Sequence, residues 1–433
     1  MKKRLAALFL TCLIFVFTAC SSIKPVPTAT SLAASTDSSA AAEKLSEPVT
    51  RADYPAAYLP GIDAVGVIPA KGYHVGIVIS QSSPYAANIE AFTELAKAYE
   101  AAFGMTVSVE QPDEAAQDDC ITQMIGSGIE FLIFAPGSNE SAADAICAQS
   151  GVPYLTLGQR LKNTLGEGGY VCTIEPDDFL CGILTGRNIA DAMKSQYGEP
   201  LGNIAEITGV VSDKASILRS GGLRHALSVY SKLNVVCSVA GNGDKDTIYK
   251  SAENIFKACR EGELDGIVVP DDSAAVTVLQ AALDYDRNDV IGRIWSAGAT
   301  VDGLTAVYYG QIAQTVETSS QTGMAAMEYA VRYLNGGTDI PAVITTLTRV
   351  FSAETQEKKD ALKNIIAALK ENDASACLES VGDYTLFQPE TNMSNYPQRY
   401  DLYADVAAYL AAFEPYTTEK PIYRKDEKIQ DEA

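Results

Sequence analysis

The sequence has very few of the residues that usually carry out catalysis or hold a metal. Its 433 residues include only two histidines, His74 and His225, and neither has a metal-ligand neighbour at helical spacing. A Gly-x-Ser-x-Gly nucleophile turn and a Walker phosphate loop are absent, and the Gly-x-Gly pairs at 126–128 and 241–243 lack the third glycine of a dinucleotide fingerprint. We therefore expect no cofactor and no metal, and an enzyme is the minority alternative.

Positive charge is also scarce. The chain has 33 lysines and arginines against 55 aspartates and glutamates, which gives a net charge of −22. Three of the cations stand at the very start of the chain, so the rest is more acidic still. Nucleic acids and anionic lipid heads both attract clustered cations, so we expect no nucleic-acid partner and no broad contact with a membrane surface. The acidic surface is better explained by solubility.

The first twenty residues form a basic and then apolar leader. Lys2, Lys3 and Arg4 precede an apolar run over 5–17, and two small residues then stand before Cys20. A basic start, a short apolar stretch and a small-residue cleavage site are typical of a secretory signal peptide, here 1–19. The cysteine at the cleavage point resembles a bacterial lipobox, which implies a lipid on Cys20 and an extracytoplasmic protein anchored to the cell membrane. The alternative is an ordinary signal peptide with an incidental cysteine.

The remaining cysteines do not form a recognisable framework. Without Cys12 and Cys20 seven are left, an odd number, and none forms a Cys-x-x-Cys motif. Most stand in apolar segments such as Val235–Cys237, where a free cysteine packs as a small hydrophobic residue. We therefore expect no disulfide framework, and so many unpaired thiols in an exported protein favour a reducing habitat.

After the leader the chain divides into a stalk and a regular core. Residues 21–50 are rich in Ser, Thr, Ala and Pro without periodicity, which predicts a flexible stalk over 20–70. Beyond it, short apolar β-rich runs alternate with amphipathic helical stripes. We expect strands at 75–79, 106–109, 131–134, 153–157, 203–208, 234–239, 265–269 and 291–296, with helices at 89–103, 114–126, 140–149, 215–230, 246–260, 272–284 and 353–371.

This alternation predicts an α/β fold with parallel sheets covered by helices on both faces. Two sets of four or five strand–helix units favour two similar Rossmann-like lobes, and a single eight-unit barrel is the alternative. The single tryptophan, Trp295, stands in a strand and is expected in the core rather than in a binding site.

Six segments then match one family in order and spacing. They are residues 74–80 with 84–85, 128–136, 151–157, 205–209 with 219–222, 265–272, and 310–316. Over about residues 73–350 the chain resembles the ribose/galactose-type (type I) periplasmic binding proteins, the substrate-binding subunits of sugar ABC transporters. The resemblance implies a monomer with two lobes, a three-segment hinge near 172–178, 312–318 and 340–350, and closure around a ligand.

The resemblance also implies domain bounds and binding residues. The first lobe would cover 71–176, completed by about 315–340, and the second would cover 177–314, completed by about 341–385, with a C-terminal extension at 386–433. The implied ligand-binding residues are Ser83, Tyr85, Gln159, Arg160, Arg219, Asp271, Gly298 and Thr318.

Departures from the family pattern weaken the prediction of a bare sugar as ligand. Ala86 and Gly243 stand where aromatic rings are usual, and Gly158–Gln159 replaces a common Asp–Arg pair. Gly298 replaces a frequent Asp, and Thr318 stands where an amide is usual. The ligand is therefore expected to be a sugar, a sugar-like molecule or another polar solute.

Asp271 and Asp272 follow one apolar strand and precede a helix expected to start at Ser273–Ala274. Adjacent residues on an extended segment point to opposite sides, so the two carboxylates are poorly placed to share one acid/base task. Asp272, next to the helix, is the expected N-cap, which leaves Asp271 for ligand.

The function that follows is a lipid-anchored solute-binding protein, not an enzyme, that delivers a small molecule to the permease of an ABC importer. One alternative is a ligand-sensing partner of a membrane receptor or histidine kinase. A second alternative is an extracytoplasmic enzyme or a structural surface lipoprotein.

Overall fold

The computed structural model describes residues 69–370, except 84, 138–140, 159–160, 162–168, 211–212, 319–321, 339, 341–342 and 347. The predicted leader, Cys20, the stalk up to residue 68, Gln159, Arg160 and the C-terminal extension lie outside the described residues. Within the described part, no helix is long and apolar enough to cross a membrane.

The first sheet has six strands, all paired in parallel, in the order β11-β5-β4-β3-β1-β2. These strands are β1 (His74–Ile79), β2 (Thr106–Glu110), β3 (Phe131–Ala135), β4 (Tyr154–Leu157), β5 (Tyr170–Pro176) and β11 (Val343–Thr346). Alternate residues of a strand point to opposite faces. In β1, Val75, Ile77 and Ile79 enter one apolar cluster and Val78 enters the other.

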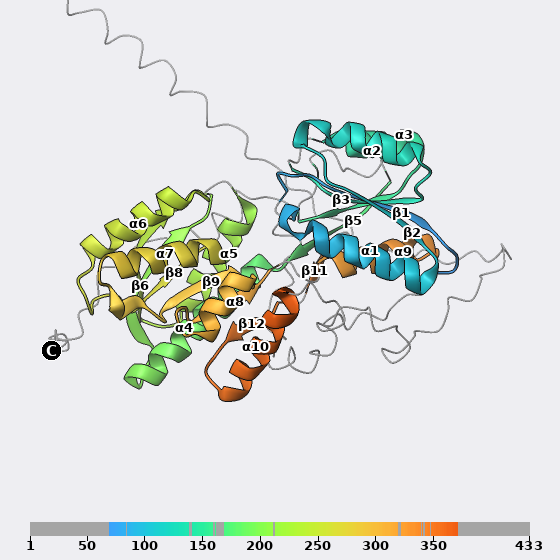
Figure 1. Cartoon of the computed structure of the whole chain (residues 1–433). Coiled ribbons are helices and arrows are strands. Elements are labelled where there is room, and N and C mark those ends of the chain that lie inside the picture. The colour runs from blue at the N-terminus through green and yellow to red at the C-terminus, as the bar shows by residue number, and fades with distance from the viewer. Residues whose placement is uncertain are drawn as a thin grey trace, which may run out of the picture. The chain divides into compact units, whose positions relative to one another are not determined.

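Helices cover both faces of this sheet (Figure 1). One face carries α1 (Ile89–Phe103) and α9 (Thr322–Leu334), and the other carries α2 (Gln117–Gly126) and α3 (Ala143–Ser150). Two short 3-10 turns, η2 (Ala86–Asn88) and η3 (Glu114–Ala116), precede α1 and α2. The α1 helix ends at Gly104, whose φ of 62° is a left-handed conformation that glycine adopts without strain.

The second sheet repeats the same plan in the order β12-β10-β9-β8-β6-β7. Its strands are β6 (Leu201–Thr208), β7 (Lys232–Ala240), β8 (Gly266–Val268), β9 (Ile294–Gly298), β10 (Gln314–Glu317) and β12 (Val350–Ser352). Its pairs are parallel except that β12 runs antiparallel to β10. The two sheets therefore have equivalent strand orders, and only the last edge differs in direction.

The second sheet is also covered on both faces. The helices are α4 (Asp178–Tyr197), α5 (Lys214–Leu227), α6 (Lys245–Ala258), α7 (Asp272–Asp284), α8 (Val301–Tyr308) and α10 (Gln356–Lys370), with the 3-10 turn η4 (Asn288–Val290) before β9. The first two pack on one face with Trp295, and α6, α7, α8 and α10 pack on the other. The predicted α/β fold with two parallel-sheet lobes is confirmed, and Trp295 lies in the core as expected, 1% exposed.

Between β1 and β12 the described chain passes from one sheet to the other three times: after β5, after β10 and after β11. Two short strands depart from the predicted lobe ranges. The sequence assigns residues 315–340 to the first lobe and 341–385 to the second, whereas β10 belongs to the second sheet and β11 to the first. Each strand has only four residues, and the periodicity of a strand does not show with which other strand it pairs.

The helices α4 and α5 touch backbone to backbone. A Cβ on Gly182 would lie 2.0 Å from the carbonyl oxygen of Arg219, and one on Gly222 would lie 2.1 Å from that of Phe179. Only a residue without a side chain fits at these two positions. The helix pair that covers one face of the second sheet therefore depends on glycine at both contact points.

We predict that Gly222→Ala destabilises the protein by about 1–3 kcal/mol, since overpacking a close contact costs that much. Gly126→Ala is the matched control. Gly126 is also a helical glycine, but a Cβ added there would have nothing within 4 Å, so stability should stay level or rise by about 0.4–1 kcal/mol. Denaturant unfolding measures both variants. Equal stabilities for the two variants would contradict the close contact.

Candidate functional site

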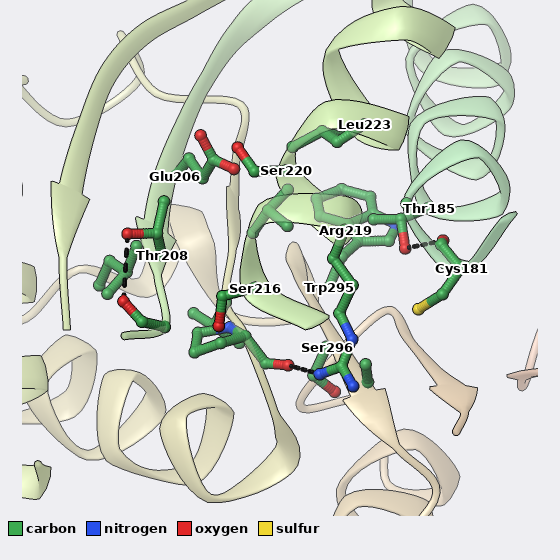
Figure 2. Close-up of a pocket in the computed structure, with 17 residues that line it drawn as sticks. Cys181, Thr185, Glu206, Thr208, Ser216, Arg219, Ser220, Leu223, Trp295 and Ser296 are labelled. Atoms are coloured by element: carbon green, nitrogen blue, oxygen red, sulfur yellow. Dashed lines mark hydrogen bonds between the residues drawn. The ribbon is translucent and has the colours of Figure 1, made fainter. Parts of the chain in front are cut away.

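A cavity lies at the carboxyl edge of the second sheet, where β6, β8 and β9 end (Figure 2). In α/β sheets of this kind, ligands bind at that edge. Residues of α4 and α5 close one side of the cavity, with Leu223 and Trp295 as its apolar wall. Trp295 is thus in the core as predicted, but it also lines the candidate site, which the sequence did not predict. Its polar lining comes from Thr185, Glu206, Thr208, Ser216, Arg219, Ser220 and Ser296.

The cavity has a volume of only about 30 Å³. A buried water needs a cavity of roughly 10–15 Å³, so there is room for very few waters. Small-molecule pockets span about 300–1,000 Å³, so this cavity alone does not enclose a sugar-sized ligand. It supplies at most one wall of such a site.

Arg219, which lines this cavity, is held in place by two hydrogen bonds. Its Nε donates to Asp178 Oδ1 at 2.8 Å, and its Nη1 donates to the carbonyl oxygen of Pro270 at 2.8 Å. Burial lowers the pKa of the guanidinium, but the Asp178 carboxylate outweighs that effect and the pKa is raised, so the cation is firmly charged. A guanidinium has five N–H donors, and these two bonds do not use all of them. The ligand role of Arg219 stays a prediction.

Asp272 joins the ends of β9 and β10 to the starts of α7 and α8. Its side chain is 1% exposed and accepts hydrogen bonds from Ser296 Oγ at 2.6 Å, Thr315 Oγ1 at 2.6 Å, and Thr300 N and Oγ1 at 2.7 and 2.9 Å. Burial raises the pKa of Asp272, and these four bonds oppose the shift. The carboxylate is thus a structural acceptor for four donors.

The capping prediction for this pair is wrong. Asp271, not Asp272, is the N-cap of α7, and its Oδ1 accepts the backbone N–H of Ala274 at 2.8 Å. The helix begins at Asp272, as in the predicted range 272–284, and one residue before the Ser273–Ala274 start on which the capping prediction depended. That shift places Asp272 in the first turn, where its side chain faces the buried donors. The ligand role of Asp271 stays a prediction, now for a residue that also caps a helix.

Gly298 and Thr318 both follow strands at the same edge. Gly298 has a φ of 134°, and a Cβ there would lie 3.1 Å from Oδ2 of Asp272. The positive φ and the nearby carboxylate of Asp272 both favour glycine at position 298, where the family often has Asp. Thr318 is half-buried after β10. The ligand contacts of both residues stay predictions.

In the first sheet, Ser83 and Tyr85 lie in the loop after β1. Ser83 Oγ accepts the backbone N–H of Tyr85 at 3.3 Å, which steadies the turn. The Tyr85 ring is 3% exposed, and a Cβ on Gly158 would lie 2.6 Å from its Cε2. The ring thus packs on the loop after β4, and its stacking on a ligand stays a prediction, as do the roles of Gln159 and Arg160.

Sequence reasoning missed Glu206, which lines the cavity from β6. Its Oε2 accepts Arg224 Nη2 at 2.5 Å and Ser238 Oγ at 2.9 Å, and its side chain is 4% exposed. A carboxylate this buried needs such partners. The available signal was an acid between apolar Ala205 and Ile207 in a predicted strand.

A larger pocket of about 510 Å³ lies between α4 and the segments that precede β9 and β10. Its lining includes Asn188, Gly292 and Ala313, so it is at the amino edge of the sheet, away from the side chains described above. Among the described residues, no group of His, Cys, Asp or Glu is arranged to hold a metal ion.

The two aspartates should differ in what they contribute to stability. Asp271→Ala removes an N-cap and should cost about 0.5–2 kcal/mol of unfolding free energy. Asp272→Ala leaves its buried donors without an acceptor. It should lower the unfolding free energy by about 3 kcal/mol or more, at roughly 1–3 kcal/mol for each unsatisfied group. Denaturant unfolding of both variants checks this order. An Asp272→Ala variant as stable as the parent would refute the buried network.

Comparisons with known proteins agree with this architecture. A profile of the periplasmic binding protein domain family matches residues 76–338, more than half of the chain. Among curated proteins, none matches this sequence.

Solved structures share the fold at low sequence identity. An arabinose ABC transporter binding protein from Shewanella sp. ANA-3 has a TM-score of 0.56 at 21% identity, covering 70% of this chain and 97% of its own. A solute-binding protein from Actinobacillus succinogenes with bound D-allose has a TM-score of 0.55 at 18% identity, covering 66% and 99%. The arabinose-binding protein of Geobacillus stearothermophilus has a TM-score of 0.55 at 17% identity, covering 68% and 98%.

These matches agree with the resemblance that the sequence segments predicted. Members of this family act outside the cytoplasm and bind solutes rather than transform them. The chain belongs to the periplasmic binding protein domain family.

Proposed function

We propose that this protein is a lipid-anchored solute-binding protein that clamps a sugar or sugar-like molecule between its two lobes and delivers it to an ABC importer. The observation that carries the proposal is the pair of parallel sheets with equivalent strand orders, linked by three passages of the chain. Such a linkage suits a hinge, because a few residues at each passage can absorb a rotation of the lobes.

The incomplete cavity supports a site made from two halves. The second sheet offers a volume of about 30 Å³ lined by hydroxyls, a carboxylate and Arg219, far below what a sugar needs. Of the predicted residues of the first lobe, Ser83 and Tyr85 follow β1 at the corresponding edge of their own sheet, and Gln159 and Arg160 come after β4 in the sequence. Together the two edges would enclose a ligand that neither encloses alone.

The relatives support a sugar as the ligand class. Two of the solved structures hold D-allose and arabinofuranose as bound ligands, and another is of an arabinose-binding protein. Hydroxyls of a sugar can donate to carboxylates and accept from guanidinium groups, which is the chemistry that Asp271 and Arg219 offer.

A panel of pentoses and hexoses tested by isothermal titration calorimetry should include at least one that binds. Asp271→Asn should weaken its binding about 10–100-fold, the equivalent of losing a hydrogen bond to a charged group at roughly 1.5–3 kcal/mol. Asparagine caps helices as well as aspartate does, so stability should be kept.

Asp244→Asn is the matched control for this variant. Asp244 caps α6 through the backbone N–H of Thr247 and is not among the predicted ligand-binding residues, so its replacement should leave affinity unchanged. Equal affinities for Asp271→Asn and the parent would remove Asp271 from the site. Failure of every sugar, with another polar solute released from the purified protein and seen by mass spectrometry, would correct the ligand class.

The membrane anchor is supported by the leader and by the small residues before Cys20. Cys20→Ala should release the protein from membranes into the soluble extracytoplasmic fraction, because the lipid would have no attachment point. Fractionation with immunoblotting measures the partition, and mass spectrometry of the parent looks for lipid on Cys20. Unchanged membrane partition together with an unmodified parent would rule out the lipoprotein.

A further inference from the structure

Two cysteines of the second lobe, Cys237 and Cys259, lie next to each other beside the apolar cluster under α6. Cys237 is in β7, and Cys259 is the C-cap of α6 with a φ of −109°. A side-chain hydrogen bond joins the two thiols. Neither cysteine is in a disulfide in the structure; Cys237 is half-buried and Cys259 is only 2% exposed.

An irregularity of β7 accompanies this contact. The pairing of β6 with β7 shifts between Ile204 and Ala205, so that Ile204 is opposite Val235 but Ala205 is opposite Cys237. One extra residue, Val236, is thereby accommodated as a bulge. Ala205 belongs to the apolar cluster under α6, and Cys237 packs against the same cluster. The bulge thus aligns Cys237 with the residues that face the end of α6.

Arg287 lies at this corner and is ion-paired with Asp289, whose carboxylate accepts its Nε and Nη2 at 2.8 Å, and the charge of Glu263 also acts on Cys259 and raises its pKa. The Arg287 side chain is 8% exposed, and its Nη1 donates to the carbonyl oxygens of Cys259 at 2.9 Å and Phe256 at 3.2 Å. The hydrogen bond from Cys237 and then the charge of Arg287 lower the pKa of Cys259 to about 7, against the opposing effect of burial. By contrast, burial raises the pKa of Cys120, Cys147, Cys172 and Cys181.

We propose that Cys237 and Cys259 are a redox-active pair that forms a disulfide when the exported protein meets a disulfide donor. A thiolate is the species that attacks a disulfide. In the first step one cysteine sulfur bonds to a sulfur of the donor and expels the donor's other sulfur as thiolate. In the second step the remaining cysteine thiolate attacks that mixed disulfide and expels the second donor thiolate. The pair loses two electrons and two protons, and the donor is reduced to two thiols.

The bond would cross-link the end of α6 to β7, closing the segment 237–259. Restricting that segment in the unfolded chain should raise stability. The sequence predicts no disulfide framework, and a bond between Cys237 and Cys259 would depart from that prediction for this one pair. It does not depend on the ligand or on the importer, because neither cysteine lines the cavity.

The test uses the full-length protein exposed to oxidised glutathione or to dithiothreitol. After oxidation, remaining thiols are blocked with iodoacetamide, and peptides are examined without reduction. We expect a cross-linked peptide that joins Cys237 to Cys259, a mass lower by two hydrogen atoms, and full reversal by dithiothreitol. The oxidation rate should reach half its maximum near the pH of about 7 at which Cys259 ionises, whereas an ordinary thiol would need a pH near 9. The melting temperature should rise by at least a few degrees.

Two variants give the comparison. Cys237→Ser should abolish both the cross-link and the rise in melting temperature on oxidation. Cys120→Ser, the control, removes a half-buried thiol of α2 and should change neither. Free Cys237 and Cys259 after oxidation of the parent would overturn the proposal. A stable glutathione adduct, or a bond from either residue to a third cysteine, would overturn it as well.

Discussion

Parallel pairing of the strands is the constraint on which the rest of this structure depends. In a parallel sheet every strand ends at the same edge, so the loops that follow the strands gather there. In the second sheet this edge needs support, because β8, β9 and β10 end next to one another. Asp272 provides it by accepting hydrogen bonds from Ser296, Thr300 and Thr315, which belong to or follow β9 and β10. The polar side chains of the candidate site lie at this edge, so their positions depend on these hydrogen bonds.

The fold could be predicted largely from the sequence because buried parallel strands and amphipathic helices leave distinct patterns. Gly76 to Ile79 and Phe131 to Ala135 are apolar on both faces, as strands between two helical layers must be. The apolar stripe of α6, with Ile248, Ala252 and Ile255, gives the helical period directly. The segments that matched the family are these same strands and the turns that follow them.

What the sequence did not reveal depends on contacts between distant residues. The helix α4 was not predicted, since Gly182 and Gly186 weaken helical propensity, and their reason is the close approach of α5. The sequence placed the N-cap of α7 at Asp272 instead of Asp271. The side chain of Asp272 is instead bonded to Ser296 and Thr315, which belong to other strands and cannot be identified as its partners from the sequence. The bonds of Arg219 to Asp178 and to the carbonyl of Pro270 likewise join three elements that only the folded chain brings together.

Closure of the two lobes on a solute is tested most directly by small-angle X-ray scattering. The protein is first freed of any bound molecule and then measured with and without a saturating sugar that calorimetry has shown to bind. Closure about the three passages between the sheets predicts a smaller radius of gyration with the ligand than without it. Superimposable scattering curves in the two conditions would contradict the clamp, whatever the affinity of the ligand.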